Sequence, residues 1–282
     1  MSHVVEINDE QLEIQLFLEA IYRKYGYDFR EYSVAHTRRR LEYRRAAEGM
    51  KNYSEMLHKV IYDPRFFEQI LLDLSINVTE MFRDPWFYKK VREIVLPHLK
   101  TYPFVKVWHA GCSAGQEVYS MGILLEEEGM NERAQLYATD FNEAILEKAQ
   151  KGIYPMDLVR QYTTNYQASG GLNSFSDYYT ADYEHVIIKN RLRDNVLFTP
   201  HNLATDGVFG EMNVIFCRNV LIYFNRELQN KVFQLFYDSL VPGGFLCLGS
   251  KESLRFSGIA EKFELVSERE KIYRKKREPV IG

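Results

Sequence analysis

Residues 105–120 read VKVWHAGCSAGQEVYS, and this stretch decides the fold. The β-branched, aromatic and apolar residues of 105–110 predict a short strand. A turn with glycines at 111 and 115 follows at once, and a helix is expected over 116–127. A strand, a glycine turn and a helix in this order let the backbone approach a ligand closely and direct helix N–H groups at it. An ordinary strand-to-helix turn remains an equal alternative, and the GxGxxG pattern of dinucleotide sites is absent.

Strands and helices alternate along the rest of the chain after residue 101. Strands are expected over 134–139, 213–217 and 245–249, helices over 142–151 and 226–240, and a final pair of strands within 263–274. Strands joined through helices imply right-handed crossovers and a mainly parallel sheet with helices on both faces, so the predicted fold class is α/β. The stretch of about 154–195 is too long for a structureless loop, and we interpret it as a small inserted subdomain that is partly β.

The first part of the chain is of a different kind. Residues 1–76 show helical spacing of apolar residues, with stops at Gly26 and Gly49, and no strand-like alternation. The predicted organisation is a helical domain over 1–76 and a linker with a helix over 77–100. An α/β domain over 101–282 follows and carries the inserted subdomain.

Composition excludes several classes of protein. The 282 residues include 20 Tyr, 18 Phe and 2 Trp, which is ample material for a core and argues against disorder. Lys and Arg number 36 against 39 Asp and Glu, so no chain-wide basic field indicates nucleic-acid binding. Apolar stretches are too short to cross a bilayer, and the start of the chain does not resemble a secretory signal. Three cysteines without CxxC spacing are typical of reduced thiols, so a cytoplasmic location is expected.

An acidic residue ends the second expected strand. Asp140 follows Thr139 about 25 residues after the glycine turn, where a carboxylate can accept hydrogen bonds from both hydroxyls of an adenosine ribose. The alternative is that Asp140 caps the next helix. Together, the glycine turn and this acid favour a ligand that contains a nucleoside.

Four motifs carry a resemblance to a known family. They are residues 77–85 (NVTEMFRDP), 111–120 (GCSAGQEVYS), 138–140 (ATD) and 217–224 (CRNVLIYF). In content and order they resemble the motifs NxTxFFR, GCSxGEExYS, ATD and CRNVxIYF of the chemotaxis receptor methyltransferases (CheR). The resemblance covers nearly the whole chain. It implies a Rossmann-like methyltransferase domain that uses S-adenosylmethionine, preceded by an all-α domain that docks the substrate.

Two positions depart from the family pattern. Met81 stands where the family commonly has Phe, and Gln116-Glu117-Val118 replaces Glu-Glu-Pro. Methionine keeps an apolar, polarisable side chain at the first position. The acid that the family uses is retained as Glu117, so neither change argues against activity.

The resemblance implies a role for individual residues. Arg83 would bind the carboxylate of S-adenosylmethionine through paired guanidinium donors, and Glu117 would hold its ammonium or line the pocket. The implied cofactor-binding residues are Asn77, Thr79, Arg83, Gly111, Glu117, Asp140, Asn202, Leu203, Arg218 and Asn219. A surface ion pair of Arg83 with Asp84 or Glu80 is the alternative for Arg83, and Asn202 as a turn residue is the alternative for Asn202.

The implied reaction is methyl transfer to glutamate side chains, which gives methyl esters in chemotaxis adaptation. A glutamate carboxylate is already ionised at neutral pH, so no general base and no metal are expected. Alignment and exclusion of water would supply the catalysis, and no catalytic residue is assigned. Tyr223 lies either near the methyl group or over the core.

A basic stretch lies in the helical domain. Residues 38–45 hold five arginines and one glutamate. Receptor methylation segments are acidic helices, and the resemblance implies that basic residues of this domain dock them. The substrate-docking candidates are Arg38, Arg40, Arg44 and Arg45. A solvated helix face is the alternative.

The expected partners are the cytoplasmic helices of chemoreceptors, with no nucleic acid and no membrane insertion, and a monomer is expected. Two other functions stay open. The chain could be a module that binds S-adenosylmethionine or S-adenosylhomocysteine and signals without turnover, or a methyltransferase for a non-chemotaxis receptor.

Overall fold

A computed structural model of the chain describes residues 8–75 and 79–277. Its contacts divide the chain into two compact units, each of which is described by itself. The first is a helical unit formed by Met1–Ile76 with Tyr223–Gln229, and the second is formed by Asn77–Ile222 with Asn230–Gly282. None of the described helices is long and apolar enough to cross a membrane.

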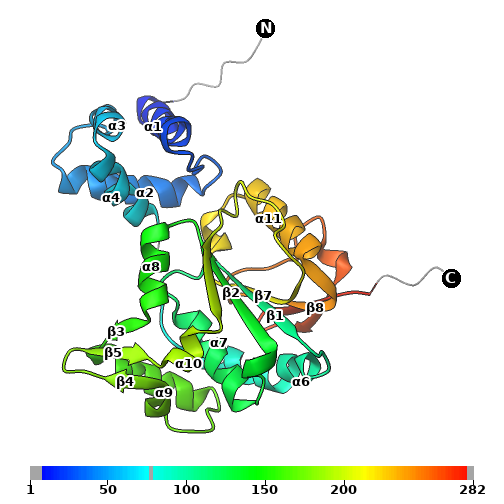
Figure 1. Ribbon diagram of the computed structural model, residues 1–282. Helices are drawn as coiled ribbons and strands as arrows, with labels where there is room; N and C mark the ends of the chain where they lie inside the picture. Colours follow the sequence, from blue (N-terminus) through cyan, green and yellow to red (C-terminus); the bar gives the residue numbers. More distant parts are fainter. Residues whose placement is uncertain (1–7, 76–78, 278–282) are drawn as a thin grey trace. The chain divides into compact units, whose positions relative to one another are not determined.

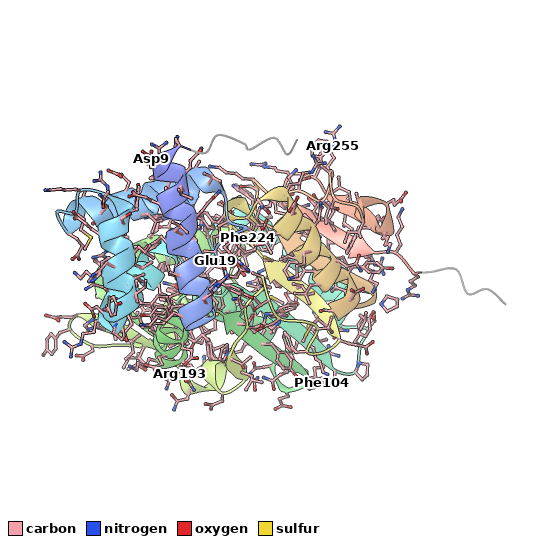
Figure 2. All side chains as sticks on the ribbon, turned by 90° about the horizontal axis from the view of Figure 1, so that it is seen from above. Asp9, Glu19, Phe104, Arg193, Phe224 and Arg255 are labelled. Atoms are coloured by element: carbon pink, nitrogen blue, oxygen red, sulfur yellow. The ribbon has the colours of Figure 1, made fainter. Side chains whose placement is uncertain are left out.

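Local sequence signals define the helices of the helical unit. They are α1 (Asp9–Tyr25), α2 (Val34–Ala47), α3 (Tyr53–Tyr62) and α4 (Pro64–Leu74). The Asn8 side chain accepts from the Gln11 N–H at 2.8 Å to begin α1, and Gly26 ends that helix in the left-handed conformation. Glu19, labelled on α1 in Figure 2, pairs with Arg23 and Arg30 on the outside of the unit. The predicted all-α N-terminal part of the fold is confirmed.

A short segment from late in the chain belongs to the helical unit. The Ser33 N–H donates to the Tyr223 carbonyl at 2.8 Å, and Tyr32 forms an isolated antiparallel bridge with Phe224. The rings of Tyr32 and Phe224 lie 4.9 Å apart, and Phe224 is labelled in Figure 2. Helix α11 (Arg226–Ser239) therefore begins in the helical unit and ends in the second unit.

A seven-stranded sheet organises the second unit (Figure 1). Its strands, in spatial order, are β6 (Val196–Pro200), β2 (Ala134–Asp140), β1 (Val105–Ala110), β7 (Met212–Cys217), β8 (Leu240–Leu248), β10 (Ile272–Lys275) and β9 (Phe263–Ser267). The first five are parallel, and β10 and β9 are antiparallel to their neighbours. The predicted mainly parallel α/β sheet is confirmed. Strand β6 was not predicted.

The two faces of the sheet are covered by different helices. On one face, Trp108 of β1 packs edge-on against Phe236 of α11, with ring centroids 5.4 Å apart. On the other face, His109 stacks on Phe216 of β7, which also contacts Phe87. Figure 1 shows α11 on one side of the sheet and α6 and α7 on the other. Along the chain before the smaller sheet, this unit contains α5 (Pro85–Lys90), a π-helical turn (Val91–Val95), α6 (Leu96–Leu99), α7 (Gln116–Glu127) and α8 (Glu143–Lys151).

A second, smaller sheet occurs within the stretch between β2 and β6. It is antiparallel and contains β3 (Ile153–Pro155), β5 (His185–Ile188) and β4 (Tyr179–Ala181) in that order, accompanied by α9 (Val159–Ala168) and α10 (Asn190–Arg193). Short 3-10 turns occupy Asn131–Arg133, Met156–Leu158, Phe175–Tyr178, Leu221–Tyr223 and Ala260–Lys262.

A buried acid at the end of α7 joins this smaller sheet region to α7 and to the π-helical turn. The Glu127 carboxylate accepts from the Tyr178 hydroxyl at 2.8 Å and from the Leu172 N–H at 3.0 Å. It also accepts from the Tyr166 hydroxyl and forms an ion pair with Arg92, and its side chain is completely buried. We refer to these five residues as the Glu127 network.

The order of the strands predicts where a ligand binds. The chain builds outward from β1 through β2 to β6 and then returns to the other side of β1 with β7. In open α/β sheets the crevice at such a reversal, outside the carboxyl ends of the strands, is the usual ligand site. Ala110, Asp140 and Cys217 are the last residues of the three strands around this reversal.

Candidate active site

The glycine turn after β1 folds tightly against the end of β2. The backbone N–H groups of Gly111 and Cys112 both donate to the Thr139 carbonyl, at 2.9 and 2.8 Å. Gly111 has a φ of +74°, and a Cβ atom there would lie 2.6 Å from a methyl group of Val220. Only glycine fits such a position, because it tolerates positive φ and has no side chain. Helix α7 begins directly after this turn, without a side-chain cap.

Asp140 points toward the glycine turn. Its carboxylate accepts from the Ser113 N–H at 3.0 Å and from the Asn142 N–H at 3.1 Å. Asn142, not Asp140, caps α8, because the Asn142 side chain accepts from the N–H groups at the start of that helix. Burial raises the pKa of Asp140 to about 6. A buried carboxylate with spare acceptor positions suits the two hydroxyl donors of a ribose.

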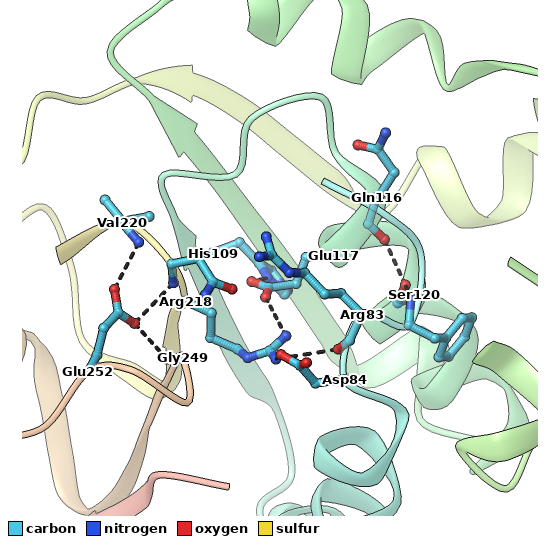
Figure 3. Close-up of polar contacts among 12 residues, drawn as sticks. Arg83, Asp84, His109, Gln116, Glu117, Ser120, Arg218, Val220, Gly249 and Glu252 are labelled. Atoms are coloured by element: carbon cyan, nitrogen blue, oxygen red, sulfur yellow. Dashed lines mark hydrogen bonds and ion pairs between the residues drawn. The ribbon is translucent and has the colours of Figure 1, made fainter. Parts of the chain in front are cut away.

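Charged side chains form a chain of contacts beside the turn (Figure 3). Arg218, which follows β7, donates to Glu117 at 3.2 Å and to Asp84 at 2.7 Å. Glu117 has a second polar neighbour in His109, whose Nδ1 lies 3.0 Å from Glu117 Oε1. Burial on its own raises the pKa of Glu117, but His109 and the charge of Arg218 together hold it below its usual value. Carboxylates and guanidinium groups therefore lie together here, which suits a ligand that carries charges of both signs.

The segment before α5 is held against the same charged chain. The Phe82 N–H donates to the Ser120 hydroxyl at 2.9 Å, and the Arg83 carbonyl accepts from Arg218 at 3.3 Å. Thr79 and Arg83 are partly exposed. The Asp84 carboxylate forms an ion pair with Arg218. Asn77 lies outside the described residues.

Glu252 is a buried residue of this edge that sequence reasoning missed. Its carboxylate accepts from four backbone N–H groups, those of Gly249 (2.6 Å), Asn219 (3.0 Å), Val220 (2.9 Å) and Leu221 (2.7 Å). Asn219 has a φ of +61°, an uncommon conformation for a residue other than glycine. Glu252 thus fixes the loop that presents Arg218 and Asn219. The sequence signal for this role is weak: Glu252 stands three residues after Gly249, at the end of an expected strand.

The remaining predicted residues lie in different surroundings. Asn202 Oδ1 accepts from the Ala204 N–H at 3.0 Å, so its side chain stabilises its own turn. Leu203 is buried beside it. Tyr223 belongs to the helical unit, where its ring centroid lies 4.6 Å from that of His36.

Some buried polar atoms near the carboxyl edge have no hydrogen-bond partner. Among the described residues, buried side-chain atoms without a hydrogen-bond partner include Gln116 Oε1, His109 Nε2 and Arg218 Nε. Such atoms are rare in folded proteins because each costs free energy. Gln116 Oε1 can accept a hydrogen bond from a polar ligand, and Arg218 Nε can donate one to it.

A cavity of about 290 Å³ lies on the Arg218 side of the crevice. It is lined by Asp84, Pro85, Trp86, Phe87, Arg218, Leu248, Ser250, Arg269 and Glu270. Asp140 ends β2, two strands away from β7, so the cavity and Asp140 lie on opposite sides of β1. The edge therefore offers space for a second molecule next to the ligand crevice.

The arginines of α2 are largely engaged within the helical unit. Arg38 pairs with Glu10 at 2.8 Å, Arg44 with Asp73 at 2.5 Å and Arg45 with Glu42 at 2.6 Å. Within the described part of the chain, Arg39 and Arg40 form no ion pair, and Arg39 is exposed. Of the predicted docking residues, Arg40 is therefore the one without an acidic partner among residues 8–75.

Comparisons with known proteins point to one family. The family described as CheR methyltransferase, SAM binding domain, matches residues 77–272, and the CheR methyltransferase all-alpha domain matches residues 12–75. A Pseudomonas putida protein that is named as a methyltransferase, Cher3, is 50% identical over 94% of this chain and 97% of its own length. A chemotaxis protein methyltransferase of Vibrio anguillarum is 34% identical over 68% of this chain and 70% of its own. One of Listeria innocua is 27% identical over 88% and 92%.

Proposed function

Because the chain belongs to the CheR methyltransferase family and carries its S-adenosylmethionine-binding domain, we propose that it methylates glutamate side chains on the cytoplasmic helices of chemoreceptors. The products are glutamate methyl esters. The observation that supports this best is the charged chain of His109, Glu117, Arg218 and Asp84 beside Asp140, at the carboxyl edge of the sheet. It provides charged and polar contacts for a cationic nucleoside.

The residues at this edge fit the cofactor. S-adenosylmethionine, when bound, supplies a methyl group activated by its sulfonium. Asp140 would accept from the ribose hydroxyls, Glu117 would hold the ammonium, and Arg83 would bind the carboxylate. Thr79, Gly111, Asn202, Leu203, Arg218 and Asn219 would complete the pocket, together with Asn77.

The acceptor glutamate needs little chemical help from the protein. It is ionised at neutral pH, so it can attack a methyl group without a general base. What the chain's own residues would do is orient the two molecules, exclude water and hold fixed dipoles around them. Turnover therefore requires no catalytic triad.

A methyl-transfer assay tests the proposal. The protein is incubated with methyl-labelled S-adenosylmethionine and receptor cytoplasmic fragments, and the matched control is a fragment whose candidate glutamates are replaced by alanine. We expect label that is released by mild base from the first fragment and none from the second. Tight binding of S-adenosylhomocysteine with no transfer to any fragment would instead support a signalling module. Transfer of the methyl group only to a receptor outside chemotaxis would instead support a methyltransferase for a non-chemotaxis receptor.

The affinity for S-adenosylhomocysteine is expected to fall about tenfold as the pH is lowered from 7.5 to 5. The ionised form of Asp140 accepts from the ribose, so binding is strong above its pKa of about 6 and is lost as the pH falls through it. Glu117, whose pKa is lowered, stays ionised in this range. Isothermal titration calorimetry measures the effect. Asp140→Asn should bind about 10–100-fold more weakly at pH 7.5 and lose the pH dependence. An equal pH slope in both proteins would contradict the ribose assignment.

Reversing the charge of Arg39 and Arg40 together is expected to lower kcat/KM for the receptor about tenfold at low salt, with a smaller loss at high salt. These two arginines form no ion pair with a described residue, whereas reversal of Arg44 would break its pair with Asp73. The dissociation constant of S-adenosylhomocysteine should not change. Arg65→Glu, at an exposed position of α4, is the control for the charge. Equal losses for the pair and for the control would mean that α2 does not dock the receptor.

A further inference from the structure

We propose that His109 is a positioning residue that fixes the Glu117 carboxylate for the charged amino group of the methyl donor. The inference rests on the proposed role of Glu117. It concerns a side chain that none of the four motifs marks as functional, the last residue but one of β1.

The imidazole of His109 is held in one place. The side chain is fully buried, and its ring stacks on Phe216 with centroids 4.8 Å apart and an angle of 15° between the planes. Nδ1 lies 3.0 Å from Glu117 Oε1, and Nε2 has no hydrogen-bond partner among the described residues. An ionised carboxylate only accepts, so Nδ1 carries the proton and donates it to Glu117. Glu117 is thus the polar contact that accounts for a histidine at this buried position.

Both oxygens of Glu117 are held, each by a different donor. His109 donates to Oε1, and Arg218 donates to Oε2 at 3.2 Å. A carboxylate held at both oxygens cannot rotate, yet each oxygen retains a second lone pair. Those lone pairs are available to an ammonium group, which binds more strongly to an acceptor that is already oriented.

Arg218 could not fix the carboxylate alone. It divides its donors between Glu117 and Asp84, and its bond to Asp84, at 2.7 Å, is the shorter. Without His109, Glu117 could turn so that both of its oxygens face the guanidinium, in the paired geometry that carboxylates and arginine favour. Its acceptor positions would then be occupied by Arg218. His109 therefore keeps Glu117 directed at the ligand rather than at its neighbour.

Comparing the binding of two nucleosides distinguishes a positioning role of His109 from a purely structural one. S-adenosylhomocysteine carries the amino group, whereas 5′-methylthioadenosine has the same adenosine and sulfur but neither amino group nor carboxylate. His109→Leu is expected to lower the affinity for S-adenosylhomocysteine about tenfold. The affinity for 5′-methylthioadenosine should change less than twofold. His109→Asn, which keeps an N–H donor near the position of Nδ1, should bind S-adenosylhomocysteine within about threefold of the unchanged protein. Calorimetry on the full chain measures all three.

A double-mutant cycle completes the test. In a Glu117→Gln background, His109→Leu should lower the affinity for S-adenosylhomocysteine by less than a further twofold, because the carboxylate that His109 positions is gone. Equal weakening of both nucleosides, or no rescue by asparagine, would overturn the proposal in favour of a packing role. Equal affinity of the unchanged protein for both nucleosides would overturn it by removing the role of Glu117. No receptor is used, so failure here is distinct from failure to methylate glutamate.

Discussion

Replacing Glu252 with alanine is expected to lower the free energy of unfolding of the second unit by about 3–5 kcal/mol. The change leaves four backbone N–H groups without an acceptor, at Gly249, Asn219, Val220 and Leu221. Each buried donor left unsatisfied costs roughly 1–3 kcal/mol, and part of that cost is recovered where water can enter. Glu252→Gln keeps one carbonyl oxygen as an acceptor, so it should lower the free energy of unfolding by about half as much as Glu252→Ala.

The measurement can be made specific to this unit. Both tryptophans of the chain, Trp86 and Trp108, lie in the second unit, so tryptophan fluorescence during urea unfolding reports on it. Glu268→Ala is the matched control, because Glu268 is exposed on the same unit and should change the free energy by less than about 0.5 kcal/mol. A loss below 1 kcal/mol for Glu252→Ala would contradict the role given to this residue. Affinity for S-adenosylhomocysteine should fall too, because Asn219 and Arg218 share the loop.

Replacing Glu127 with alanine is expected to cost a similar 3–5 kcal/mol, the range found when one partner of a buried ion pair is removed. Arg92 would lose its fully buried partner, and the hydroxyls of Tyr166 and Tyr178 would lose their acceptor. Burial raises the pKa of Glu127, but Tyr166 and Arg92 outweigh burial and hold it below its usual value. The stabilisation is therefore complete at neutral pH and is lost as the pH falls through that lowered pKa.

The neighbouring residue supplies the comparison. Glu128 pairs with Lys100 and, at 3.6 Å, with Arg92, but it is partly exposed, so Glu128→Ala should cost about 0–1 kcal/mol. Unfolding followed by fluorescence gives the two free energies, and limited proteolysis within residues 153–193 shows whether the smaller sheet is released first. Similar losses for the two glutamates would mean that the Glu127 network does not stabilise the unit.

Sequence reasoning succeeded where the signal is local. The strand Val105–Ala110 and the glycine turn were read directly from their residues, because β-branched residues and positive-φ glycines act over a few positions. The strand Val196–Pro200 was missed because it lies at the edge of the sheet and is only partly buried, so it lacks a continuous apolar pattern. The family was identified from motifs, and the comparisons confirm it.

Sequence reasoning failed where function depends on contacts between distant residues. Nothing local in the sequence connects Glu252 to the backbone of Asn219, which is 33 positions away. Likewise, Arg44 reads as a surface cation until Asp73, 29 positions on, is found to pair with it. His109 reads as part of a strand, and only its distance to Glu117 reveals a polar role.

Residues Tyr223–Gln229 belong to the helical unit, and this limits how chimeras with related proteins can be designed. Residues Tyr223–Gln229 supply the backbone partner of Ser33 and the ring that meets Tyr32, although they are encoded far downstream of both. A chimera that exchanges only the first 76 residues with a relative would join helices of one origin to a pairing segment of another. Exchanging the helical unit between family members therefore calls for a two-piece graft, with the front helices and residues 223–229 moved together.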